Sequence, residues 1–529
     1  MNRSRAAAAT VLASLLVLAG CTEPKVRQPR PSSSGTAAPS AGTSTPGLDP
    51  SAPGNDFDAT EGTDPALAAF YSQEPTWESC TGSGNLECAE VLVPMNYADP
   101  NGETITIAVN RNQTAGPGAP TLLLNPGGPG GSGTEMAEYA PFLFTGVTDT
   151  YNVAGFDPRG VETSSAIDCV TDPELDAWLT KDADISTDEG LQAYVEEFRG
   201  FAQDCVDNTG PLLEFVDTDS VARDLDILRA VVSQTEQLDY VGFSYGTFLG
   251  AVYADLFTER VGSFVFDAAV DPALSLAELA LGQAQGFDRA ITAFMEDCLA
   301  GSSCFHQGSV DEGLAKISQL FDVAFATSLP TSDANRPLTS SLALTGVITA
   351  MYTTLYWSAL NTALDEAVNR GTGTALLALA DTGNSRNPDG TFDGNGSEVI
   401  MAVNCLDYPV EGTLEDWRAA AEQMNVDYPT FGDAMAYSEV TCSNWPYQSS
   451  RVREQISASG SSPILVVGTT RDPATPYEWS VSLAEQLENG HLLTLDGDGH
   501  TSYGMNSCIT RHVDEFLLTG TIPAAGTTC

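Results

Sequence analysis

A serine between two glycines is the strongest chemical signal in this sequence. The pentapeptide Gly242–Gly246, GFSYG, follows the apolar segment Gln237–Val241 and precedes Thr247–Tyr253, which has the composition of a buried helix. At such a strand-to-helix junction the two glycines permit a tight, strained turn that raises the serine hydroxyl clear of the sheet. We therefore predict that Ser244 is a nucleophile.

A serine hydroxyl is a weak nucleophile until a base takes its proton, and a carboxylate must orient that base. The chain has four histidines: His306, His491, His500 and His512. His491 opens a strand pattern, His512 lies in a helical pattern, and His306 lies in a helix-rich region. His500 alone ends a loop of Asp and Gly residues directly after a strand pattern, so we predict that it is the base.

The acid that orients His500 should also follow a strand. Asp472 follows the strand pattern 464–470 by one turn and lies 28 residues before His500, which leaves room for one helix and one strand. Asp496 and Asp498 remain alternatives, but they share the loop of the histidine, from which its far ring nitrogen is awkward to reach. The prediction is Asp472.

A tetrahedral oxyanion needs two backbone N–H donors. The residue after the nucleophile, Tyr245, supplies one. The loop Asn125–Gly133, NPGGPGGSG, follows another apolar strand pattern, and its glycines let backbone amides approach a ligand closely. Phosphate binding is the rival interpretation, but the Lys-Ser/Thr ending of a phosphate-binding loop is missing. We predict that Gly128 is the second donor.

The elements that must position these residues form two patterns. Residues 64–271 alternate strands with helices, which predicts a mostly parallel sheet with helices on both faces; the clearest strands are 104–109, 120–125, 151–157 and 263–267. Residues 272–455 are mainly helical, with segments 277–299, 311–326, 341–370 and 414–423. The strand pattern returns in residues 456–529. We expect an α/β core whose helical cap is inserted before the strand that leads to Asp472.

The first residues read as an export signal. Arg3 and Arg5 precede the apolar run Ala6–Leu18, which ends in Leu-Ala-Gly-Cys at Cys21. This pattern predicts a lipoprotein signal peptide over 1–20, lipidation of Cys21 and a disordered Pro/Ser/Thr/Gly tether over 21–63. The protein would then be extracytoplasmic and anchored by lipid to the outer face of the cell membrane. The alternative is an ordinary signal peptide with a chance cysteine, or a protein that is shed or secreted.

The charge of the chain is strongly negative, with 71 acidic and 22 basic residues and a net charge of -49. Such a surface repels nucleic acid and favours cationic small substrates by steering. A general adaptation of the surface to solubility or salt explains the same composition. We expect no nucleic-acid partner and a monomer.

The chain has 11 cysteines, and removal of Cys21 for lipidation leaves an even set of ten. The simplest prediction is sequential pairing, each bond adding about 2–4 kcal/mol if unstrained: Cys80–Cys88, Cys169–Cys205, Cys298–Cys304, Cys405–Cys442 and Cys508–Cys529. Metal binding is the rival, but the sequence has no C-x-x-C pair and its histidines are scattered. We expect no metal, and serine chemistry requires no cofactor.

Several motifs, taken together and in order, resemble the secreted tripeptidyl aminopeptidases, which are α/β-hydrolases related to proline iminopeptidase. The matching segments are Gly127–Gly130, Asp157–Gly160, Ala222–Arg229, Gly242–Thr247, Asp472–Pro476, Gly499–His500 and, in the cap, Cys405–Asp407 and Cys442–Pro446. Two departures stand out. Asn125-Pro126 replaces a histidine of proline iminopeptidases, and residues 160–164 lack a second glycine. The missing glycine is expected to change the shape of the substrate pocket. The resemblance therefore does not determine the length of the released peptide.

The resemblance implies release of short peptides, expected to be tripeptides, from free N-termini. A carboxylate of the cap must then hold the substrate ammonium. Asp407, beside a predicted disulfide, is our candidate, although a solvated Asp is the default in so acidic a chain. We expect Arg159 to lock the Asp157 loop through an internal ion pair. The alternatives are a carboxylesterase or lipase with the same triad and a non-catalytic peptide-binding lipoprotein.

Overall fold

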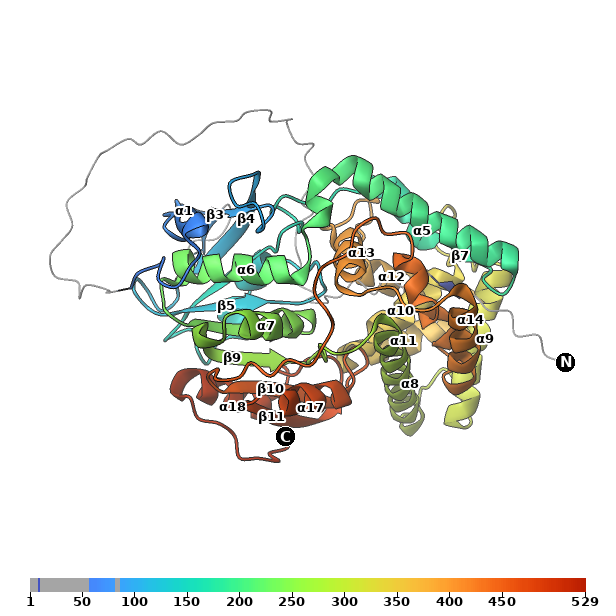
Figure 1. Ribbon diagram of the computed structural model, residues 1–529. Coiled ribbons are helices and arrows are strands. Elements are labelled where there is room, and N and C mark those ends of the chain that lie inside the picture. The colour runs from blue at the N-terminus through green and yellow to red at the C-terminus, as the bar shows by residue number, and fades with distance from the viewer. Residues whose placement is uncertain (1–7, 10–56, 81–85) are drawn as a thin grey trace.

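The computed structural model describes residues 8–9, 57–80 and 86–529. Three predicted features lie outside the described residues: the lipidated Cys21, the signal peptide apart from residues 8–9, and the tether up to residue 56. Within the described part of the chain, no helix is both long and apolar enough to cross a membrane. A large sheet flanked by helices occupies one side of the molecule, and a group of helices occupies the other (Figure 1).

The large sheet has the order β11-β10-β9-β8-β5-β6-β4-β3-β2. Strands β6, β5, β8, β9, β10 and β11 run parallel to one another, whereas β4, β3 and β2 form an antiparallel edge in which β4 pairs with β6. Their bounds are β2 (Glu78–Ser79), β3 (Leu86–Pro94), β4 (Thr104–Asn112), β5 (Thr121–Asn125), β6 (Asn152–Phe156), β8 (Leu238–Phe243), β9 (Val261–Asp267), β10 (Ile464–Arg471) and β11 (Gly490–Asp498). A separate antiparallel ladder joins β1 (Ala8–Ala9) to β7 (Asp182–Ala183).

Helices cover both faces of the parallel part, which explains the continuous apolar runs of its strands. Along β5, Leu123 packs on one face, and Leu122 and Leu124 pack on the other, because successive side chains of a strand point to opposite sides. The helices outside the insertion are α1 (Ala68–Tyr71), α2 (Gly133–Glu138), α3 (Ala140–Leu143), α4 (Asp172–Thr180), α5 (Asp188–Thr209), α6 (Thr218–Leu228), α7 (Tyr245–Leu256), α17 (Tyr477–Gln486) and α18 (Ser507–Thr519).

The second group of helices lies between β9 and β10 in sequence. They are α8 (Leu276–Ala300), α9 (Val310–Ala326), α10 (Ser340–Met351), α11 (Trp357–Leu364), α12 (Thr374–Gly383), α13 (Gly396–Asp407), α14 (Leu414–Asp427), α15 (Gly432–Met435) and α16 (Ser438–Cys442). Helices α8 to α12 share a second hydrophobic core around α10, all of whose residues are buried, whereas the buried residues of α13, α14 and α16 pack into the core that includes the sheet. The predicted fold class, a mostly parallel α/β core with a helical insertion before the Asp472 strand, is confirmed.

Local sequence sets where the long cap helices begin. Ser275 and Glu278 form a reciprocal capping box at the start of α8, and Ser309 and Glu312 do the same for α9. The helical pattern over 341–370 is divided, because α10 ends at Met351 and α11 begins at Trp357. Thr353 caps the short turn between them by accepting a hydrogen bond from the Leu355 N–H.

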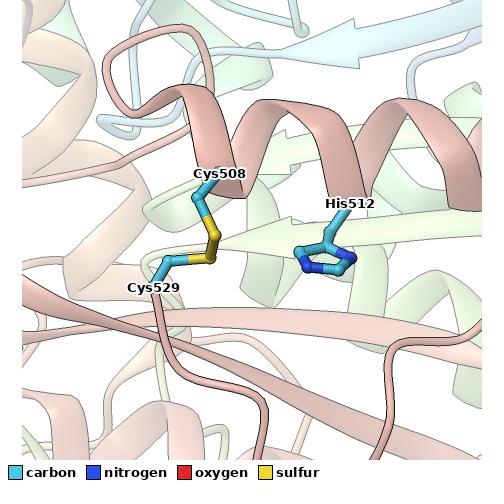
Figure 2. A group of neighbouring side chains, drawn as sticks. All are labelled: Cys508, His512 and Cys529. Carbon is cyan, nitrogen blue, oxygen red and sulfur yellow. A yellow bond between two sulfur atoms is a disulfide. The ribbon is translucent and has the colours of Figure 1, made fainter.

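The ten described cysteines are joined in sequential order. Cys508 and Cys529 connect α18 to a segment that hydrogen-bonds to β11, where Cys529 N–H donates to the Thr494 carbonyl at 2.8 Å. His512 lies beside this disulfide (Figure 2), so a Cys-Cys-His group is close enough to hold a metal ion. While the sulfurs are bonded to each other they lack the thiolate form that binds metals, which leaves His512 as one ligand.

Candidate active site

Ser244 lies on the sharp turn between β8 and α7. Its backbone has φ 54° and ψ -122°, a strained conformation for a residue with a side chain. Both flanking glycines are required by space: a Cβ on Gly242 would lie 2.3 Å from the Gly246 carbonyl oxygen, and one on Gly246 would lie 2.7 Å from the Asn125 carbonyl oxygen. The surrounding strands stabilise this strained backbone conformation, which places Ser244 at the end of the sheet.

Asp472 and His500 lie after the neighbouring strands β10 and β11 and contact each other directly. The His500 Nδ1 atom is 2.8 Å from one Asp472 carboxylate oxygen and 2.9 Å from the other. The same carboxylate accepts hydrogen bonds from the Ala474 and Thr475 N–H groups, each at 2.9 Å. With Nδ1–H donating to Asp472, Nε2 presents a lone pair, and it has no hydrogen-bond partner among the described residues. This tautomer is the one that can take a proton from a serine.

The two alternative acids are engaged elsewhere. Arg471 donates to Asp496 at 2.9 Å and to Asp498 at 2.7 Å, so both carboxylates are held in ion pairs. Both residues belong to β11, which extends to Asp498, and not to the loop of His500 that the sequence pattern predicts for them. Neither contacts the His500 ring. The structure therefore places only Asp472 where it can orient the base.

The glycine loop after β5 packs against the serine turn. A Cβ on Gly127 would lie 3.0 Å from the Ser244 Cβ and 3.2 Å from the Tyr245 nitrogen, so only a glycine permits this approach. Tyr245 is the first residue of α7, where a backbone N–H has no acceptor within the helix. Gly128, Ser244 and Tyr245 line the same cavity, as the two predicted oxyanion donors and the nucleophile must.

The cavity measures about 200 Å³ and lies between the sheet and the cap. None of the described residues that line it has a charged side chain. Its walls are aromatic and aliphatic, with a few uncharged polar groups. The rings are Tyr194, Phe198, Tyr245, Phe248, Phe287, Tyr352, Tyr408, Tyr437 and Trp479, and the other polar side chains are Gln283, Asn404, Ser438, Thr441 and Thr475.

Asp407 is in the cap, at the last position of α13, but its carboxylate does not line the cavity. It accepts hydrogen bonds from the Thr218 N–H at 3.0 Å and the Thr218 hydroxyl at 2.5 Å, and that hydroxyl is 2.6 Å from the Tyr245 hydroxyl. This position differs from the expected one, because docking of α13 on the N-terminus of α6 turns the side chain into the protein. Asp407 links the cap to the core instead of facing a substrate.

Burial gives Asp407 a measurable effect on stability. Burial, and secondarily the nearby Asp217, raise the pKa of Asp407 to about 7. A carboxyl whose pKa is higher in the folded than in the unfolded state binds more protons when folded, so its contribution to stability falls as the pH rises from about 4 to about 7. We expect the difference in melting temperature between Asp407→Asn and the parent protein to shift in favour of the variant between pH 5 and pH 8. An unchanged difference across that range would contradict the assignment.

Arg159 is fully buried and takes no part in the cavity. It forms an ion pair with Asp224 at 2.6 Å and also donates to the Pro94 and Met95 carbonyls. Asp157 instead accepts hydrogen bonds from Ser132 and Thr134. The internal ion pair expected for Arg159 is therefore present, and it ties the Asp157 loop to Asp224 on α6.

Some residues of the site carry no local sequence signal. Tyr352, at the end of α10, accepts a hydrogen bond from the His500 N–H at 2.8 Å through its carbonyl, and its ring lies edge-on to the imidazole. Tyr194 and Phe198 reach the cavity from α5, which precedes the predicted cap in sequence. The aromatic spacing of α5 indicates a buried face but not what that face contacts.

Comparison with known proteins gives matches along most of the chain. Residues 120–309 match the family described as alpha/beta hydrolase fold, and residues 428–529 match the family described as TAP-like protein. The serine protease Hip1 of Mycobacterium tuberculosis is 35% identical over 481 residues, which cover 86% of this chain and 91% of that protein.

Two further relatives have other names. Tripeptidyl aminopeptidase of Streptomyces lividans is 30% identical over 470 residues, covering 86% of both chains. Carboxylesterase B of Mycobacterium tuberculosis is 32% identical over 482 residues, covering 87% of this chain and 91% of that protein. The names of the relatives thus include both peptide and ester hydrolysis.

Proposed function

The chain belongs to the α/β-hydrolase family of serine hydrolases that includes the TAP-like proteins, and from this premise we propose that it is an extracytoplasmic serine exopeptidase that releases short peptides, tripeptides above all, from free N-termini. The observation that carries the proposal is the Asp472–His500 pair, which leaves His500 Nε2 without a hydrogen-bond partner among the described residues, in a chain whose Ser244 lies on a strained turn.

In the proposed mechanism, the Ser244 oxygen attacks the scissile carbonyl while His500 Nε2 takes the hydroxyl proton. Asp472 holds the imidazole and stabilises its positive charge. The N–H groups of Gly128 and Tyr245 bind the oxyanion. Collapse of the intermediate expels the amine, which receives the proton from His500 and leaves an acyl-Ser244. Water, deprotonated by His500, then releases the peptide acid and restores the serine.

The size of the cavity supports release of short products. At about 200 Å³ it lies below the ~300–1,000 Å³ usual for ligand sites, and the cap helices cover it. A few residues at a chain end can occupy a space of this size. The net charge of -49 would attract a positively charged N-terminus.

The substrate ammonium requires an anionic partner. The buried Glu439, on α16, accepts a hydrogen bond at 2.9 Å from the hydroxyl of Ser438, which lines the cavity. We assign ammonium recognition to this pair in place of Asp407. In this arrangement Ser438 contacts the substrate, and the negative charge of Glu439 attracts the ammonium while its carboxylate stays buried.

The uncharged wall also favours a second candidate, a carboxylesterase or lipase that uses the same triad on a neutral acyl group. A non-catalytic peptide-binding lipoprotein has no use for an oriented base beside a strained serine. The five disulfides are typical of an oxidising, extracytoplasmic compartment. We further propose a monomer that is anchored to the membrane by lipid at Cys21.

The decisive measurement compares a tripeptide 4-nitroanilide that has a free amine with its N-acetylated twin. We expect cleavage of the free form to dominate by roughly 10- to 100-fold in kcat/KM, because a hydrogen-bonded charge contributes about 1.5–3 kcal/mol. Glu439→Gln should reduce this ratio, and the matched change Asp407→Asn should leave it intact. Equal cleavage of both anilides would overturn the exopeptidase proposal, and rapid hydrolysis of 4-nitrophenyl esters alone would establish the esterase.

A further inference from the structure

Asp267 is a fully buried carboxylate that the mechanism above does not use. It is the last residue of β9, between the strand that leads to Ser244 and the strand that leads to Asp472. In the sheet register it pairs with Phe243 on β8 and with Val467 on β10. Its side chain therefore stands at the end of the sheet where the catalytic groups gather.

Asp267 contacts both the nucleophile turn and the segment that carries the base. Its backbone carbonyl accepts a hydrogen bond from the Ser244 N–H at 3.0 Å. Its carboxylate accepts the Ser502 N–H at 3.0 Å, the Ser502 hydroxyl at 3.3 Å and the Tyr503 N–H at 2.7 Å. These donors follow His500 by two and three residues. One residue thus fixes the distance between the turn of Ser244 and the loop of His500.

The charge of Asp267 is compensated only weakly. Among the described residues no Lys or Arg forms an ion pair with it. Burial raises the pKa of Asp267 to about 6, the amides of Tyr503 and Ser502 and the nearby His500 oppose this rise, and Asp472 adds to it. His500 and Asp472 are the titratable groups that face it. A negative charge so placed favours the positive imidazole that forms during catalysis.

We propose that Asp267 is a positioning residue: through the amides of Ser502 and Tyr503 it holds the His500 loop against the Ser244 turn, and its charge stabilises the protonated imidazole. The inference rests on the proposed triad but not on the identity of the substrate. It is a second carboxylate that acts on the base, and it does so through Ser502 and Tyr503, whereas Asp472 contacts the imidazole directly.

The test replaces Asp267 by Asn, which keeps the size of the side chain and removes its charge. The readout is the second-order rate of Ser244 sulfonylation by a sulfonyl fluoride, which needs neither a peptide nor an ester substrate. We expect a fall of about 10²-fold, the order of loss that follows small misplacement of a catalytic group. The acid limb of the pH–rate profile should move to lower pH, because loss of the negative charge makes the protonated imidazole less favourable.

The matched control is Asp239→Asn at the opposite end of β8. Asp239 accepts the Ser263 N–H at 2.7 Å and the Tyr151 hydroxyl at 3.1 Å, and burial raises its pKa as well. We expect this variant to lower the melting temperature and to leave both the labelling rate and the acid limb unchanged. An acid limb unmoved in Asp267→Asn, or moved equally in the control, would overturn the proposal.

A milder variant keeps the proposal testable if Asp267→Asn does not fold. Ser502→Ala removes one hydrogen bond to the carboxylate, at 3.3 Å, and should slow labelling about 2- to 10-fold, the net effect of one typical hydrogen bond. An unchanged rate in this variant would count against a positioning role. If the parent protein itself is not labelled at Ser244, the proposed triad fails, and that outcome is distinct from failure of the role of Asp267.

Discussion

Replacing Ser244 by alanine is expected to lower kcat by about 10⁴- to 10⁶-fold, the range seen when the nucleophile of a serine triad is removed. In the proposed mechanism the Ser244 oxygen forms the acyl bond, and no other described hydroxyl lies on a strained turn that packs on the glycine loop. The slow hydrolysis that remains would come from the oxyanion donors and substrate binding. Steady-state hydrolysis and loss of sulfonyl-fluoride labelling measure the effect.

Non-additivity provides the control for this prediction. His500→Ala and the double variant Ser244→Ala/His500→Ala should be about as slow as Ser244→Ala alone. Residues that act as a unit have non-additive effects, because removal of one already abolishes the contribution of the other. A double variant that is slower by the product of the single effects would show that the two residues act separately. Full activity in Ser244→Ala would place the nucleophile elsewhere.

Replacing Asp472 by asparagine should lower kcat by about 10⁴-fold with little change in fold. The carboxylate accepts a hydrogen bond from Nδ1–H, which leaves Nε2 with the lone pair that can take a proton. An asparagine can turn its NH₂ group toward Nδ1, which favours the tautomer that has its proton on Nε2. In that form the imidazole has no lone pair with which to accept the Ser244 proton.

Asp498→Asn is the matched control, since Asp498 is the last residue of β11, two residues before His500, and is paired with Arg471. We expect a change in kcat of less than about 10-fold, because the ion pair is partly exposed and such pairs contribute little. Comparable losses in the two variants would mean that the histidine is oriented by its own loop and would contradict the role of Asp472.

Much of the proposed catalytic arrangement can be predicted from short segments of sequence. GFSYG, the glycine loop and DPATP each encode a turn at the end of a strand, and parallel strands bring such turns to one edge of the sheet. Strand patterns therefore predict both the fold and the proximity of Asp472 to His500. The sequential disulfides close short loops and need no knowledge of tertiary contacts.

The rest depends on how the cap docks, which short patterns do not encode. Asp407 is predictable as a residue near the site, but its direction follows from the position of α13 on α6. Tyr352 contacts His500, but the two residues are far apart in the sequence and no local pattern predicts their contact. Tyr194 and Phe198 belong to α5, an excursion from the core toward the cap (Figure 1). Such contacts depend on how the helices of the cap pack against the core, because α5, α13 and the sheet share one cluster of buried side chains.

The long insertion between β9 and β10 has a consequence for the biosynthesis of the active protein. About 200 residues separate these paired strands, so their contact closes a large loop and is expected to form late. A nascent or half-folded chain can build the turn of Ser244 while lacking both Asp472 and His500. Such a chain is chemically inert. Hydrolytic competence arises only when the last strands dock, which gives the protein the delay that many proteases obtain from a removable propeptide.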